Sequence, residues 1–545
     1  MHRFKKEKTV QECVQSQSVE REIDSMSAKG IKNAVSQIRI CIDSFLVLFL
    51  LLTGILLFSA CNSTDSLNDS DQTEISEEDP TPVDETGDEG TGAIPIYSWD
   101  PGEFDNIYDI GPGKPYTEPG DVPWETLEPS SLVRIYYRDT PYRAKWVVNV
   151  AGTAQRPVVI LGIADSGQRP VISGEGATTR QELDYWNEVR SVIKIGGSSY
   201  PDNPEGPSHI FIQGLDIRSA RPGYLFLDDS GSSQEYSSNA AAIHIEEGTA
   251  ITIHDCLLHD AANGLFSGSA SSQVTISGNY IFDNGIEDSI YQHNSYTESQ
   301  GILFEYNHYG PLRSDCLGNN LKDRSSGTVI RYNWIESGNR QLDLVETDYE
   351  HIADDPAYDE TFVYGNVLIE PDDAGNSQIL HYGGDGGDID MYRRGILYFY
   401  HNTVVSTRDG NTTLLRLSTV DVTALVFNNI IYTSAGGNCL AITSGNGQTE
   451  LEDNWLPAGW QLTHEAGLDS GASVTDLGNI EGIEPGFEDP DTQNFHLSEG
   501  AEARGGAGGL PADVEDYPVE YQYVRHQDIE ERPVNDTTDI GAFEH

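Results

Sequence analysis

The sequence is poor in basic residues and in cysteine. It holds 32 Lys and Arg residues against 88 Asp and Glu residues, which gives a formal net charge of −56 and a sequence pI near 4.3. This balance argues against a nucleic-acid partner and favours a surface suited to saline surroundings. Only Cys256, Cys316 and Cys439 follow Cys61, so the fold cannot depend on a disulfide framework and buried free thiols are expected.

Helical periodicity is also scarce. Beyond the N-terminal region, no long segment carries apolar residues at a convincing 3.6-residue spacing. Short runs rich in β-branched and aromatic residues recur instead, each with an Asn near the same place. These residues are Asn279, Asn307, Asn333, Asn366, Asn402 and Asn429, at successive spacings of 28, 26, 33, 36 and 27 residues. The repeat length is typical of a solenoid built from strands.

Stacked coils explain the recurrent Asn. A turn between two strands needs a residue that tolerates the left-handed backbone conformation, and an Asn amide can bond the same amide in the next coil. We therefore predict that the six Asn residues form a structural ladder, and that His401 beside Asn402 is structural as well.

The ends of the repeat region carry further signatures. The opening segment VPWETLEPSSLVRIYYRDTPYRAKWVVNVAGTAQRPVVILGI (residues 122–163) resembles the N-terminal cap of bacterial right-handed parallel β-helix proteins of the pectin-lyase-like kind. NIEGIEPGFEDPDTQNFHLSEGAEARGGAG (479–508) and RPVNDTTDIGAFEH (532–545) resemble their C-terminal ending. The resemblance spans residues 95–545 and implies an all-β fold, a single-stranded right-handed parallel β-helix, in a group of proteins many of which degrade polysaccharides.

The N-terminal region predicts export. Residues 45–58, FLVLFLLLTGILLF, form an apolar run too short for a comfortable membrane span and lead into Ser59, Ala60 and Cys61. We interpret residues 1–60 as a lipoprotein signal, with Met26 as an alternative start, and Cys61 as the lipidated N-terminus; a plain secretory signal or a short anchor is the alternative. Residues 61–94 form an acidic tether. The protein is then expected to be an extracytoplasmic monomer, lipid-anchored in the cell envelope at the outer membrane or cell surface.

One segment departs from the acidic balance. Residues 319–346, NNLKDRSSGTVIRYNWIESGNRQLDLVE, hold four basic and four acidic side chains. Strand alternation predicts the following orientations: Ile330, Tyr332, Ile335, Leu342 and Leu344 inside the coil, and Arg331, Trp334 and Asp343 outside. An outer row of cations suits a long anionic polymer. Alternatively, the cations pair with Asp323, Glu336, Asp343 and Glu346 in a structural ladder.

The basic segment suggests β-elimination. This reaction needs a neutralised uronate carboxylate, a base near the sugar carbon and an acid for the leaving oxygen. The segment is similar to that of the chondroitinase B and β-helix alginate lyase family, in which a Lys and an Arg on successive coils flank the scissile uronate. The predicted catalytic residues are Lys322, Arg324, Arg340, His293 and Tyr296. The predicted substrate-binding residues are Arg313, His308, Arg331, Asp343 and Glu346.

The sequence thus predicts a polysaccharide lyase acting on an anionic polysaccharide. The alternative is a noncatalytic surface protein that binds glycan or cell envelope through the same groove. No cofactor is required by these patterns, although Ca²⁺ could bind Asp385, Asp388 and Asp390 in HYGGDGGDIDMY (residues 381–392), where a flexible acidic loop is the alternative.

Overall fold

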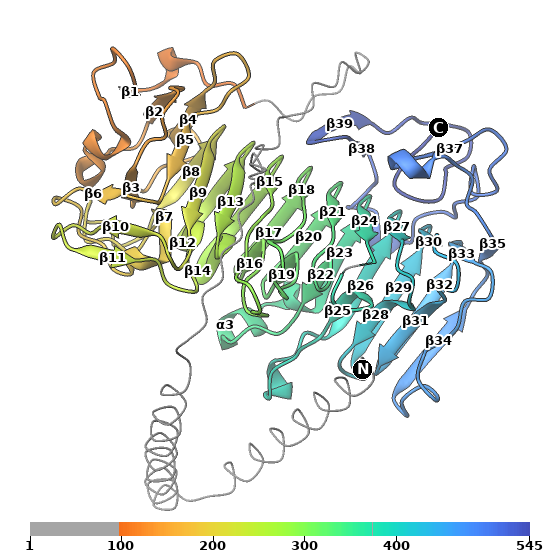
Figure 1. Cartoon of the computed structure of the whole chain (residues 1–545). Coiled ribbons are helices and arrows are strands. Elements are labelled where there is room, and N and C mark those ends of the chain that lie inside the picture. Colours follow the sequence, from red (N-terminus) through yellow and green to blue (C-terminus); the bar gives the residue numbers. More distant parts are fainter. Residues whose placement is uncertain (1–96, 373) are drawn as a thin grey trace, which may run out of the picture. The chain divides into compact units, whose positions relative to one another are not determined.

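The computed structural model describes residues 97–372 and 374–545 (Figure 1). The predicted signal, tether and lipidated Cys61 lie outside the described residues. None of the helices within the described ranges is long and apolar enough to cross a membrane.

The described chain is a solenoid in which each central coil supplies one short strand to each of three parallel sheets (Figure 1). The first sheet contains β16 (Ser295–Thr297), β19 (Leu321–Asp323), β22 (Leu342–Leu344), β25 (Gln378–Tyr382) and β28 (Thr412–Leu417). The second contains β17 (Gln300–Glu305), β20 (Ser326–Arg331), β23 (Glu360–Tyr364), β26 (Gly395–Tyr400) and β29 (Val422–Phe427). The third contains β15 (Tyr280–Ile281), β18 (His308–Tyr309), β21 (Trp334–Glu336), β24 (Val367–Glu370) and β27 (Thr403–Ser406).

This architecture confirms the predicted parallel β-helix. The first and second sheets are joined by the long strands β12 (Ala241–His254) and β14 (Asn263–Ser277). Apolar side chains stack in register along the interior, as in the column Ile330, Val363, Phe399 and Val426 of the second sheet. Removal of this apolar surface from water is the main favourable term in folding, at about 25 cal/mol per Å² buried.

The Asn ladder is also confirmed. The side-chain amide of Asn279 donates to Asn307 (3.0 Å), and that of Asn307 to Asn333 (2.9 Å). The same bond is repeated along the remaining members of the ladder, which runs on through Asn366, Asn402 and Asn429 to Asn454 and Asn479. The left-handed residue, however, is the one before the Asn, as at Tyr332 (φ 53°), so that part of the prediction is wrong. The Asn side chains form the ladder and also bond backbone groups of neighbouring coils, as where Asn333 Nδ2 donates to the Phe304 carbonyl (3.0 Å).

The C-terminal segment explains a second difference from the prediction. Tyr332 lies outside the main core, in a cluster with Tyr306, Tyr364 and Ile529, and its hydroxyl donates to the Pro518 carbonyl (3.1 Å). The predicted interior position is therefore wrong, because the turn at Tyr332 sends its ring outward. Trp334 points out of the coil as predicted.

The C-terminal segment buries part of the exterior of the solenoid. Trp334 packs beneath Phe495 and Tyr523, while Val514 and Ile529 join the tyrosine cluster beside the second sheet. The hairpin of β38 (Tyr521–Val524) and β39 (Asp528–Glu531) belongs to this cover. Residues of the second and third sheets are thus covered by the chain itself.

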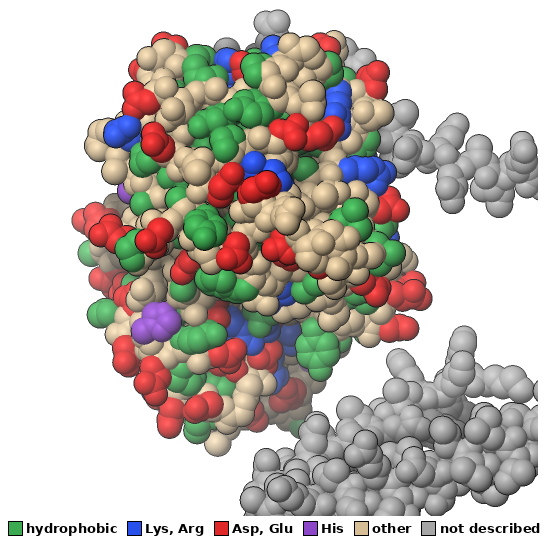
Figure 2. All heavy atoms as spheres, turned by 90° about the vertical axis from the view of Figure 1, so that its left-hand side faces the viewer, with side chains coloured by type: hydrophobic (Ala, Val, Ile, Leu, Met, Phe, Trp, Pro, Cys, Tyr) green, Lys and Arg blue, Asp and Glu red, His purple; other side chains and the backbone are tan. Residues whose placement is uncertain are grey.

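The cysteines and the surface charge agree with the composition. Cys256 is buried, Cys316 and Cys439 are half-buried, and all three are free thiols. Figure 2 shows the face around the N-terminal end of the solenoid, where acidic side chains are widely scattered and Lys and Arg side chains occur in small groups.

Candidate functional site

A column of chemically active side chains runs along the first sheet. Register pairing aligns these residues of successive strands: Phe266, Tyr296, Lys322, Asp343, His381 and Arg416. Neighbouring strands lie about 4.8 Å apart, so the side chains of successive coils are within reach of one another. The solenoid thereby brings residues that are far apart in the sequence next to one another on one surface.

Asp343 is the centre of this column. Its Oδ2 accepts hydrogen bonds from Lys322 Nζ (2.8 Å) and Asn319 Nδ2 (2.7 Å), and its Oδ1 lies 2.9 Å from His381 Nδ1. Arg340 Nη1 lies 3.6 Å from the same Oδ1. Burial would raise the pKa of Asp343, but the His381 hydrogen bond and the Lys322 charge hold this pKa well below its usual range. Asp343 is therefore a buried, permanently ionised anchor for the cations.

Lys322 is held as a cation. Its Nζ also lies 3.1 Å from Asp385 Oδ2. Burial alone would lower the pKa of Lys322, but the Asp343 and Asp385 carboxylates raise this pKa above its usual value. In this arrangement the ammonium supplies positive charge and is not a free base at neutral pH.

Arg324 contacts the hydroxyl of Tyr296. Its Nε donates to the Tyr296 hydroxyl (3.0 Å), and its Nη1 donates to the Glu346 carbonyl. Lys322 Nζ and the Arg324 guanidinium carbon lie 6.0 and 5.7 Å from the Tyr296 ring centre. Burial alone would lower the pKa of Arg324. The charges of Tyr296 and Asp348 outweigh this effect, so the pKa lies above its usual value. Two fixed cations would therefore stabilise a negative charge formed on the Tyr296 oxygen.

His293 positions the tyrosine. Its ring lies edge-on to Tyr296 with ring centres 5.3 Å apart, and its Nδ1 accepts from the Asn319 backbone amide (2.9 Å). Complete burial, and then the Lys322 charge, lower the pKa of His293 to about 3. His293 is thus a neutral imidazole with its proton on Nε2, and its acceptor nitrogen is already occupied.

An acidic loop lies against the cations. Glu346 accepts hydrogen bonds from the amides of Asp385 (2.9 Å) and Gly386, so its carboxylate anchors the loop. The Asp385 carboxylate faces Lys322 and lies 3.9 Å from Arg324 Nη2, while its side chain is 45% exposed. A carboxylate is therefore already held by both cations at the solvent boundary.

Arg340 extends the site along the column. Its Nε and Nη2 donate to Gln378 Oε1 (3.1 and 2.7 Å), which directs the guanidinium toward the next coil. Burial lowers the pKa of Arg340, opposed by the Asp343 charge.

All five predicted catalytic residues thus lie in or directly beside strands of the first sheet, but three predicted substrate-binding residues do not. Arg313 pairs with Asp260 (2.8 Å) and Asp283 (3.2 Å). Arg331 pairs with Glu305 (2.7 Å) on the second sheet. His308 belongs to the third sheet. The sequence could not separate these residues, because a basic side chain looks the same on any side of a coil.

The predicted calcium ligands do not converge. Asp388 caps the short helix η6 (Ile389–Met391), and Asp390 is almost fully exposed beside Arg394. Among the carboxylates and histidines of residues 97–372 and 374–545, these two and Asp385 form no group whose ligand atoms lie within 4.8 Å of one another.

Several residues in or beside the column were not predicted as part of the site. They are Asn319, Gln378, His381 and Arg416, while Asp385 was predicted only as a possible calcium ligand. Arg416 takes part in none of the ion pairs found in the described part of the chain, and its side chain is partly exposed. Alignment of the short runs LDL, LHY and LRL at residues 342–344, 380–382 and 415–417 would have revealed the register.

Two surface cavities lie elsewhere. One of 510 Å³ is lined by His401, Arg532 and Glu544 among others, and one of 490 Å³ by Trp334 and Arg525 among others. Neither contains a predicted catalytic residue. The column is instead reached from solvent through the partly exposed Tyr296 and Arg416 and the exposed Asp385.

Comparison with known proteins gives distant structural matches only. No family model and no curated protein matches the sequence. Among solved structures, an alginate lyase from Paenibacillus sp. str. FPU-7 matches at 11% identity, covering 60% of this chain and 93% of that chain with a TM-score of 0.36. The pectate lyase Pel9A matches at 11% identity over 81% and 97%, with a TM-score of 0.38. A rhamnogalacturonan lyase matches at 12% identity over 75% and 97%, with a TM-score of 0.33. Likeness at this level says nothing about activity.

Proposed function

We propose that this protein is a polysaccharide lyase that cleaves a uronate-containing anionic polysaccharide by β-elimination on the first sheet. The observation that carries the proposal is the placement of the Tyr296 hydroxyl beside Arg324 and near the Lys322 ammonium. These groups provide a proton acceptor and fixed positive charge within one patch, as the reaction requires.

Asp385 supports the binding half of the proposal. Its carboxylate bridges Lys322 and Arg324 at the solvent boundary, where a uronate carboxylate of the substrate could replace it. Asp343, by contrast, is fully buried and stays in place as the counter-charge of Lys322. Displacement of the exposed carboxylate by substrate would leave the cations correctly positioned.

The chemistry follows from this placement. With the uronate carboxylate neutralised by Lys322 and Arg324, the phenolate form of Tyr296 removes the proton from C5 of the sugar and becomes the neutral phenol. The electron pair of that C–H bond forms the C4–C5 double bond, and the C4–O bond to the next sugar breaks. The leaving oxygen takes the bonding electrons and receives the proton that Tyr296 has taken up. The cations stabilise the charge that develops on the carboxylate between these steps.

The open column suits a long polymer. A chain that lies across successive coils meets Arg340 and then Arg416 beyond the reacting sugar, and Arg416 has an uncommitted guanidinium in the described structure. Local positive charge matters here because the strongly acidic protein otherwise repels a polyanion. Lipidation at Cys61 and export, which remain predictions, would place the enzyme outside the cytoplasm, anchored in the cell envelope.

The test is a screen of the purified protein against alginate, pectate, chondroitin and sulfated algal glycans. Product is followed by the ultraviolet absorbance of the new C4–C5 double bond. We expect one uronate polymer to yield unsaturated ends, and Arg324→Ala to lower the rate by about two orders of magnitude. Arg331→Ala, which changes an arginine of the second sheet, is the matched control and should retain activity. Absence of unsaturated products with every uronate polymer would refute the proposal.

A further inference from the structure

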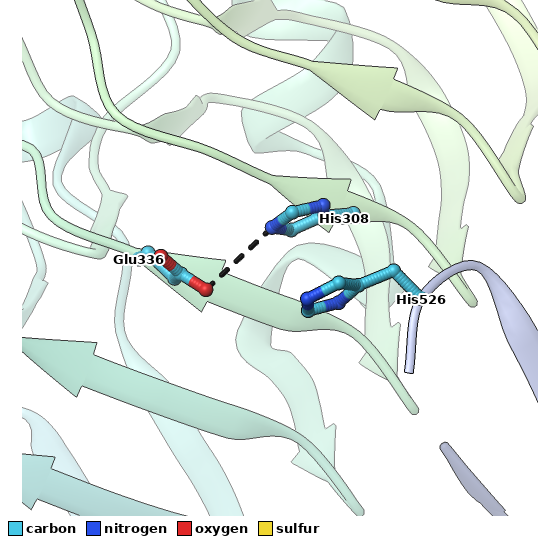
Figure 3. Close-up of side chains that lie close together, drawn as sticks. All are labelled: His308, Glu336 and His526. Carbon is cyan, nitrogen blue, oxygen red and sulfur yellow. Dashed lines mark ion pairs between the residues drawn. The ribbon is translucent and has the colours of Figure 1, made fainter. Parts of the chain in front are cut away.

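Three side chains of metal-binding type lie close together beside the third sheet, away from the first sheet that carries Lys322. His308 lies in β18, Glu336 in β21, and His526 in the turn between β38 and β39. One ligand atom from each lies within 4.8 Å of the others. Figure 3 shows the two imidazole rings face to face, with the Glu336 carboxylate directed toward His308. Three distant segments of the chain therefore contribute to one cluster.

His308 has an unsatisfied nitrogen in this cluster. The residue is only 8% exposed, and its Nε2 has no hydrogen-bond partner among the described residues. The nearest acidic atom, Glu336 Oε1, lies 3.6 Å away, which is too long for a hydrogen bond. Tyr280 and His526 stack on the ring, with centres 4.3 and 4.0 Å away. A buried polar atom without a protein partner calls for an explanation, and a bound ion is one that would also use the neighbouring His526 and Glu336.

The other two groups suit the same ligand. His526 offers an imidazole nitrogen and Glu336 a carboxylate oxygen, and each lies within 4.8 Å of a ring nitrogen of His308. Trp334 Nε1 donates to Glu336 Oε1 and holds the carboxylate in place. The exposed side of His526 leaves a path for an ion and a water molecule.

We propose that His308, Glu336 and His526 bind one divalent transition-metal ion, with Zn²⁺ as the preferred ion. Two imidazole nitrogens and one carboxylate with an open fourth position form a ligand set that Zn²⁺ favours, whereas Ca²⁺ and Mg²⁺ prefer oxygen alone. Ligand bonds of about 2.0 to 2.2 Å require the rings to turn out of their parallel stack toward the shared ion.

The bound ion would fasten the C-terminal hairpin to the solenoid. His526 belongs to the hairpin, while His308 and Glu336 belong to adjacent coils. An ion that binds only the folded arrangement stabilises it by RT ln(1 + c/Kd), where c is the concentration of free ion. The ion thus has a structural role, in which it holds the C-terminal segment against the solenoid. Its site is separate from the proposed catalytic column.

The test uses the purified protein without an affinity tag, stripped with a chelator and titrated with ZnCl₂ by calorimetry. We expect one ion per chain and a rise in melting temperature. His526→Phe keeps an aromatic ring on His308 but removes the donor nitrogen, and Glu336→Gln keeps an oxygen for the Trp334 N–H but removes the charge. Each should weaken Zn²⁺ binding at least tenfold and abolish the rise in melting temperature.

His545→Gln is the matched control. His545, Asp539 and Glu544 form the other cluster of this kind in the described chain, but Arg532 already pairs with Glu544 (3.1 Å). This variant should bind Zn²⁺ as the wild type does. Absence of binding by the wild type, or wild-type affinity in His526→Phe, would overturn the proposal. Loss of binding in His545→Gln would move the site to the other cluster.

Discussion

Replacement of Asp343 by Ala tests the anchor of the proposed catalytic column. The substitution removes the carboxylate from Lys322, Asn319 and His381 at once, and leaves Lys322 with the half-exposed Asp385 as its remaining ion-pair partner. Removal of one partner from a buried ion pair costs about 3 to 5 kcal/mol, because the other charge stays buried without compensation. We expect a loss of unfolding free energy in that range, measured from the midpoint and slope of urea unfolding.

Two comparison variants make this experiment specific. Lys322→Met combined with Asp343→Ala should recover a large part of the loss, because both charges are then absent. Asp385→Asn should cost no more than about 1 kcal/mol, since its ion pair is half-exposed. If Asp343→Ala lowers the unfolding free energy by less than about 1 kcal/mol, Asp343 does not hold the cations in place. The site geometry described above would then be contradicted.

The pH dependence of the same variant has a definite sign. The folded-state pKa of Asp343 is depressed, so its contribution to stability is complete above the unfolded value near 3.9 and is lost as pH falls toward the folded pKa. The difference in unfolding free energy between wild type and Asp343→Ala should therefore narrow below about pH 4 and remain constant above about pH 5.

Three further predictions test the loop, the ladder and the anchor. Asp385→Ala should strengthen binding of the anionic polysaccharide, measured by calorimetry, because the exposed carboxylate no longer competes for Lys322; unchanged or weaker binding would show that Asp385 does not occupy the substrate position. Asn333→Ala should lower the unfolding free energy by about 1 to 3 kcal/mol, because it leaves buried partners on both sides unsatisfied, and loss of glycan binding without loss of stability would contradict a structural role. Cys61→Ser should lose the label in metabolic labelling with a fatty-acid analogue, whereas retained label would rule out lipidation at this residue.

The fold could be predicted from the sequence because its determinants are local and periodic. Each ladder Asn sits in a short β-branched run, so the repeat shows in the sequence before any long-range contact is known. The orientation of Tyr332 was not readable, because it depends on a turn conformation and on Pro518 from the distant C-terminal segment. Local patterns identify the coil, while the cover over it comes from residues almost 200 positions away.

The candidate site was readable only in part. Tyr296, Lys322 and Asp343 follow one another at 26 and 21 residues, close to the repeat, so they could be assigned to neighbouring coils. His381 follows Asp343 after 38 residues because a longer connection intervenes. The spacing therefore did not reveal that the two residues are paired in register. Arg331 and His308 were predicted for the same patch but lie on the second and third sheets, because nothing in a basic or imidazole side chain reveals which of three sheets carries it.

The most direct test of the account is the rate of formation of unsaturated sugar ends by Tyr296→Phe. The substitution removes only the hydroxyl that meets Arg324 and leaves the ring against His293. We predict that the rate falls by about two orders of magnitude, while polysaccharide affinity and melting temperature stay close to wild type. A wild-type rate in this variant would contradict the assignment of Tyr296 as the base and, with it, the proposed catalytic arrangement.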